Sequence, residues 1–114
     1  MKVSYFISAL FFIYQSAFAA TCPPDFVEDL HAQLKSNIPA ITWLDINLKP
    51  EAHGCQFHIR FYPCTASTKV ELGILLPVAI STVNKQCSLI DKGRCEHEQG
   101  YCVLKNVGVG CEAS

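Results

Sequence analysis

The sequence has 114 residues, of which 50% are hydrophobic, and its formal net charge is −1 at pH 7. A chain of this length is expected to form one domain. Because it is close to neutral and slightly acidic, it has no general electrostatic attraction to nucleic acid or to anionic lipid, and nucleic acid is not expected as a partner.

Residues 1–19 have the pattern of a secretory signal peptide. Lys2 supplies a positive start, an apolar stretch follows from Tyr5 to Tyr14, and Ala17-Phe18-Ala19 fits the cleavage pattern. The apolar stretch is shorter than the roughly 20 residues that span a bilayer, and no later segment is expected to be long enough. We therefore expect a secreted, extracellular domain over residues 20–114, without a permanent membrane anchor.

Seven cysteines lie in this domain, which predicts disulfides in a small secreted protein. Their connectivity cannot be deduced from the sequence. We expect three intramolecular bridges, at least one of which joins the last three cysteines of the chain to the first three. The unpaired cysteine is expected to be either buried or available to link two chains as a homodimer. The seven are Cys22, Cys55, Cys64, Cys87, Cys95, Cys102 and Cys111.

The first element is expected to be a helix over residues 25–37. Asp25 is a suitable N-cap, and Glu28 three residues later would complete a capping box. Pro39 ends the segment. The apolar residues of the helix recur every four positions, as on one face of a helix. They are Phe26, Leu30 and Leu34.

Two strands are expected next, over residues 41–48 and 54–64, because side chains alternate between apolar and polar in both. Residues 50–54 would form the turn of an antiparallel hairpin. The second strand organises the domain, since its apolar side needs to be covered. On its apolar side are Cys55, Phe57, Ile59 and Phe61, and on its polar side are Gln56, His58, Arg60 and Tyr62.

The second half of the chain predicts a short strand at 67–73, a helix that begins near Leu76, a charged loop over 88–100 and a last strand over 101–109. The helix is placed there because Pro77 is tolerated in a first turn but not in a helix interior. One longer helix from Thr68, kinked at Pro77, is the alternative. Together, these elements predict an α+β fold: a two-layer sandwich of two helices on a three- to four-stranded antiparallel sheet, stapled by disulfides.

Five features together resemble the small secreted cysteine-rich effectors of plant-associated fungi, especially the killer-toxin-like and necrosis-inducing-factor-like α/β sandwiches. The odd number of cysteines departs from the even sets of that group. The resemblance implies a protein that acts on host tissue or competitor microbes by binding or membrane damage, without catalysis. The features are Cys22 before the first helix, a strand with Trp43, the segment Gly54-Cys55-Gln56-Phe57-His58-Ile59, Cys87 at a helix end, and the tail Val107-Gly108-Val109-Gly110-Cys111.

The polar side of the predicted hairpin is the candidate site. Exposed Trp, Tyr and Arg are enriched in binding hot spots, so the surface could bind a protein or a glycan. A ribonuclease is an alternative, with Asp45 and His58 as the proton-transfer groups. An ordinary solvated sheet face is a third interpretation. The candidate residues are Trp43, Asp45, His58, Arg60 and Tyr62.

Two other segments carry residues that could form a site. Cys95-Glu96-His97, with Cys87 and Cys102, lacks the short cysteine spacing of structural zinc sites, so no metal and no cofactor are expected. The loop over 88–100 could instead present a rigid segment, as protease inhibitors do.

The leading interpretation is a secreted effector or toxin-like virulence protein, not an enzyme, that binds a protein, a glycan or a membrane component of a host or competitor. The alternatives are a ribonuclease-like hydrolase and a protease-inhibitor-like module.

Overall fold

The structure is a computed structural model that describes residues 22–49 and 55–112. The expected signal peptide and the expected turn at 50–54 lie outside these residues. Two helices and five strands are present in the described part of the chain. They are α2 (Phe26–Asn37), β1 (Trp43–Leu48), β2 (Cys55–Tyr62), α3 (Ala66–Val83), β3 (Cys87–Asp91), β4 (Arg94–His97) and β5 (Cys102–Cys111).

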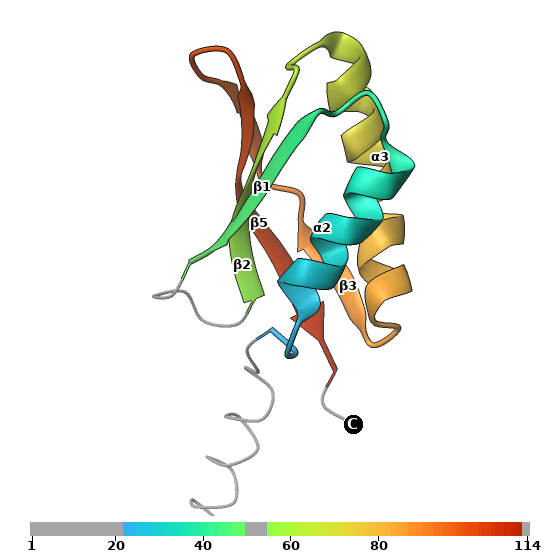
Figure 1. The fold of residues 1–114 in the computed structure, drawn as a ribbon. Helices are drawn as coiled ribbons and strands as arrows, with labels where there is room; N and C mark the ends of the chain where they lie inside the picture. Colours follow the sequence, from blue (N-terminus) through green and yellow to red (C-terminus); the bar gives the residue numbers. More distant parts are fainter. Residues whose placement is uncertain (1–21, 50–54, 113–114) are drawn as a thin grey trace, which may run out of the picture.

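The strands form one antiparallel sheet, and both helices lie on the same face of it (Figure 1). The order is β1-β2-β5-β3, and β4 also pairs with β5. Because β2 occupies one edge of β5, β3 and β4 share the other edge. Strand β3 pairs with the second half of β5 and β4 with its first half. The predicted two-layer α+β sandwich is confirmed, with one strand more than expected.

Residues 88–100 contain β4 and most of β3, so the prediction of an irregular loop there is wrong. Their charged residues suggested solvent exposure, and most of them are indeed exposed. However, edge strands tolerate charged side chains because only one of their edges is paired. The backbone of this segment therefore extends the sheet as β3 and β4 while its side chains remain accessible.

Helix α2 closely matches its predicted bounds, but the predicted cap does not form. Asp25 has a φ of 63°, and its side chain caps no backbone group. An N-cap side chain reaches the first turn from an extended backbone, which this left-handed conformation does not provide. The buried stripe of the helix is as predicted, with Phe26, Leu30 and Leu34 all at most 2% exposed.

Helix α3 replaces two predicted elements, so the short strand at 67–73 and the helix start near Leu76 are both wrong. The helix runs through Pro77, as the alternative of one longer helix required. A proline removes the hydrogen bond to the carbonyl four residues earlier, here that of Gly73. Both Pro77 and Gly73 are exposed, so water can solvate this carbonyl.

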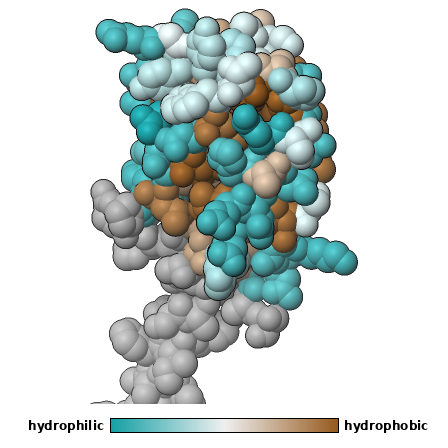
Figure 2. All heavy atoms as spheres, viewed as in Figure 1, coloured by the Kyte–Doolittle hydropathy of each residue, from teal (hydrophilic) through white to brown (hydrophobic). Residues whose placement is uncertain are grey.

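By length and composition alone, α3 could span a membrane, so the expectation that no later segment could is also wrong. Core helices share these properties, and α3 buries Leu72, Leu76 and Ile80 against the sheet. Its outward side is apolar too, with Val70 and Ile74 among the exposed residues. Figure 2 likewise shows apolar atoms that reach the surface between polar side chains.

The structure contains three disulfides, which confirms the predicted number of bridges. They join Cys22 to Cys55, Cys64 to Cys102, and Cys87 to Cys111. The Cys64–Cys102 bridge is the predicted link between the late and the early cysteines. Cys95 is the free cysteine and it is exposed, so the alternative of a buried thiol is wrong. A link between two chains through Cys95 stays a prediction.

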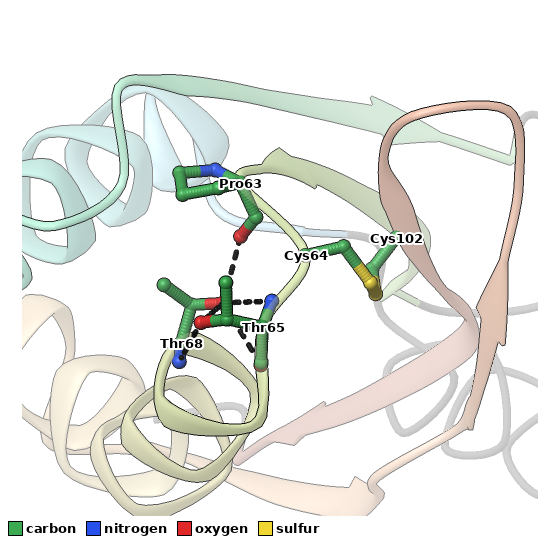
Figure 3. Close-up of a disulfide and its surroundings, with 5 residues drawn as sticks. All are labelled: Pro63, Cys64, Thr65, Thr68 and Cys102. Atoms are coloured by element: carbon green, nitrogen blue, oxygen red, sulfur yellow. Dashed lines mark hydrogen bonds between the residues drawn. A yellow bond between two sulfur atoms is a disulfide. The ribbon is translucent and has the colours of Figure 1, made fainter.

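Beside the Cys64–Cys102 bridge, two threonines close the turn from β2 into α3 (Figure 3). The Thr65 hydroxyl accepts from the Thr68 amide at 3.1 Å, and the Thr68 hydroxyl accepts from the Thr65 amide at 3.0 Å. The Thr68 hydroxyl also donates to the Pro63 carbonyl at 2.7 Å. This reciprocal cap explains why a polar side chain that is only 1% exposed is tolerated here.

We predict that Thr68→Val lowers the free energy of unfolding by about 1–3 kcal/mol, because it leaves the Pro63 carbonyl and the Thr65 amide without their partner. Thr82→Val is the matched control, since Thr82 is exposed on the same helix and should change stability by less than about 0.5 kcal/mol. Urea unfolding measures both. Equal midpoints for the two variants would contradict this role of Thr68.

Candidate functional site

The pairing of β1 with β2 gathers the five candidate residues on the sheet face opposite the helices. Trp43 lies opposite Tyr62, and Asp45 lies opposite Arg60. His58 lies opposite Asn47. The prediction that these side chains share one face is therefore confirmed. We call this surface the polar face; its predicted members are Trp43, Asp45, His58, Arg60 and Tyr62.

Arg60 is held in place by an acid and an aromatic ring. Its Nη2 lies 2.6 Å from Asp45 Oδ2, which also accepts a hydrogen bond from Asn47 at 2.7 Å. The guanidinium lies 5.9 Å from the centre of the Trp43 ring, within the range of a cation–π interaction. The hydrogen bond from Arg60 lowers the pKa of Asp45, so this carboxylate is ionised at neutral pH.

Tyr101 extends the aromatic part of this face. Its ring meets that of Trp43 edge to face, with the ring centres 6.0 Å apart. It is carried by the turn between β4 and β5, where the Glu98 amide donates to the Tyr101 carbonyl. Gly100 in this turn has a φ of 85°, a conformation that glycine adopts without strain. Trp43 and Tyr62 are about half exposed, so their rings are accessible.

Strands β5 and β4 add a buried valine and several charged side chains to the polar face. Val103, opposite Arg60 on β5, is only 4% exposed although it lies outside the main core. Next to it, Lys105 Nζ lies 3.0 Å from Glu96 and 3.9 Å from Glu98. The hydrogen bond from Lys105 lowers the pKa of Glu96. Lys105 is therefore paired with two carboxylates.

A β-bulge in β5 explains the position of His58. Ile59 lies opposite Leu104, but Phe57 lies opposite Val107, so Lys105 and Asn106 together face His58. Asn106 has a φ of 62°, and its amide donates to His58 Nδ1 at 3.1 Å. The imidazole therefore satisfies an amide that the bulge has removed from the strand ladder.

Two open hollows lie on this face. One of about 320 Å³ is lined by Asn47, His58, Arg60, Glu98, Tyr101, Val103 and Lys105. The other, of about 410 Å³, is lined by Trp43, Tyr62, Gln99, Gly100 and Tyr101. Their walls combine aromatic rings with donors and acceptors in fixed positions, an arrangement suited to contact with another molecule.

Proton transfer is less well supported by this geometry. Asp45 is engaged by Arg60 and Asn47, and a carboxylate with a lowered pKa is a poor general base. His58 accepts through Nδ1, so a neutral ring carries its proton on Nε2 and presents a donor to solvent, not a base. Burial, together with the positive charges of Lys49, Lys105 and Arg60, lowers the pKa of His58.

The structure also places the two other segments that the sequence analysis named. Cys87 and Cys102, considered as zinc ligands, are each in a disulfide. No group of three or more potential metal ligands is found among the described residues. The segment 88–100, the candidate inhibitory loop, is mainly strand, and the turn between β4 and β5 projects at the end of the sheet (Figure 1).

Sequence reasoning missed Tyr101, Val103 and Lys105 as parts of the polar face. Strand β5 was predicted, but its partner strand and register were not, so its residues could not be assigned to a side. No protein-family model, curated protein or solved structure matches this chain.

We predict that Asp45 contributes stability that acid removes. Its folded-state pKa is lowered, so the contribution is present above the unfolded value and is lost as the pH falls through the folded value. From about pH 5 to pH 2, Asp45→Asn should therefore lose less stability than the wild type does. Urea unfolding across this pH range measures the slope. An unchanged slope in Asp45→Asn would contradict the prediction.

We also predict that His58 carries its proton on Nε2 and titrates below the ordinary histidine pKa of 6.5. Long-range ¹H–¹⁵N spectra distinguish the two tautomers and follow the titration. The Nδ1–H tautomer would contradict the hydrogen bond from the Asn106 amide.

Proposed function

We propose that this protein is a secreted effector or toxin-like protein that acts by binding, not by catalysis, and that the polar face is its contact surface. The partner is a protein or a glycan of a host or competitor. Three disulfides in so small a domain are typical of extracellular proteins, which supports the secreted part of the proposal. The resemblance to fungal killer-toxin-like and necrosis-inducing-factor-like effectors points the same way.

The observation that carries the proposal is the fixed position of Arg60 between Asp45 and Trp43. Trp, Tyr and Arg dominate binding hot spots, and side chains that are already ordered lose less entropy on binding. Three aromatic residues lie near this guanidinium. Trp43 and Tyr62 lie opposite each other on β1 and β2, and the Tyr101 ring meets the Trp43 ring edge to face. An ordinary solvated sheet face has no need of an arginine that is held in one position beside half-exposed aromatic rings.

Trp43 is the only tryptophan of the chain, so its fluorescence reports directly on the polar face. The purified domain should be titrated with fractions of plant apoplastic fluid, microbial culture fluid and soluble cell-wall glycans. A partner that binds this face should change the Trp43 emission and protect it from acrylamide. The ligand in the active fraction can then be purified for measurements on variants.

We predict that Arg60→Ala and Trp43→Ala each weaken binding of that purified ligand about 5- to 150-fold, corresponding to about 1–3 kcal/mol. Calorimetry measures all variants without relying on Trp43. Ile90→Ala is the control, since Ile90 is an exposed apolar residue of β3 outside the polar face and should bind as the wild type does. Equal affinities for all three variants would reject the polar face as the contact surface.

The ribonuclease alternative is tested in parallel. Purified domain should leave RNA intact over a range of pH. Cleavage that disappears in His58→Ala would instead favour a nuclease at this face.

A further inference from the structure

A third hollow, of about 250 Å³, lies on the helix side of the sheet and plays no part in the polar face. It lies between α3 and the helix-facing side of the sheet, where Cys95 of β4 and Leu104 of β5 form part of its lining. The lining residues are Phe61, Lys69, Leu72, Gly73, Leu76, Leu89, Lys92, Gly93, Cys95 and Leu104.

The lining combines buried apolar residues with two exposed lysines. Five of the residues are large and apolar, and Phe61, Leu72 and Leu76 among them are almost fully buried. Lys69 and Lys92 are the charged residues of the lining, and both are exposed. No carboxylate lines the hollow to pair with these lysines. The hollow is therefore complementary to an apolar chain that ends in an anion.

We infer that this hollow binds a free medium-chain carboxylic acid, with its chain against Phe61 and the leucines and its carboxylate at Lys69 and Lys92. The volume sets the chain length. A cavity of about 150 Å³ accommodates the six carbons of benzene, so 250 Å³ has room for about ten carbons. Decanoate is accordingly the probe.

Cys95 provides a direct readout of occupancy. It lines the hollow, and it is the one free cysteine of the chain, since all seven cysteines lie within the described residues. A bound acid should shield its thiol from a small reagent such as iodoacetamide. At nine-tenths occupancy the alkylation rate should fall about tenfold, because only the free protein reacts. The decrease should saturate below the micellar concentration of decanoate.

Two comparisons separate specific binding from general hydrophobic attraction. Decyltrimethylammonium has the same chain length and the opposite charge, and should need at least about tenfold higher concentration for the same protection. The double variant Lys69→Gln with Lys92→Gln should raise the half-saturating decanoate concentration about fivefold. Equal protection by the two probes, or an unchanged rate with decanoate, would overturn the inference.

Gly73 offers a variant that fills the hollow without disrupting the fold. A Cβ at this position meets nothing within 4 Å, so Gly73→Leu can place its side chain in the open space. Because this leucine itself shields Cys95, decanoate binding is measured here by saturation-transfer NMR. The signal should disappear in Gly73→Leu and persist in Gly73→Ala, with circular dichroism confirming that both variants are folded. A wild-type signal in Gly73→Leu would overturn the inference.

Discussion

The structure depends on strand β5, which is paired along both edges and is held at both ends by disulfides. Cys102 at its start is bound to Cys64, and Cys111 at its end is bound to Cys87. β2 covers one edge, and β3 and β4 share the other. A domain of this size buries a limited core, so covalent links that fix a central strand contribute a large part of its stability. The register of this strand determines which side chains lie on the helix side of the sheet and which lie on the polar face.

The bulge at Lys105 and Asn106 sets which residues reach which face. Before it, Val103 lies beneath Arg60 on the polar face; after it, Val107 and Val109 face the helices. Without the extra residue, all three valines would lie on one side, because side chains alternate along a strand. This one bulge thus places Val103 on the polar face and Val107 and Val109 on the helix side of the sheet. His58 accepts the hydrogen bond from the Asn106 amide that the bulge removes from the strand ladder. His58 consequently has a structural role as well as a place on the candidate surface.

Much of the fold and of the candidate site could be predicted from the local sequence pattern. The alternation in β2 identified the buried side, and with β1 it placed Trp43, Asp45, His58, Arg60 and Tyr62 on one face. Other features depend on tertiary contacts that local pattern does not encode. Helix α3 continues through Pro77 because the affected turn faces solvent, and the charged segment after α3 becomes strand because β5 offers a free edge. Tyr101 and Lys105 join the polar face only through the register of β5.

Disulfide mapping tests the central role of β5 most directly. Proteolysis of the alkylated, non-reduced protein, followed by mass spectrometry, should recover Cys64 linked to Cys102, Cys87 linked to Cys111 and Cys22 linked to Cys55. Cys95 should carry the alkyl group. A bridge from Cys95 to Cys102 or Cys111 would contradict the account, because β5 could then not be held at both ends in the register that separates the two faces.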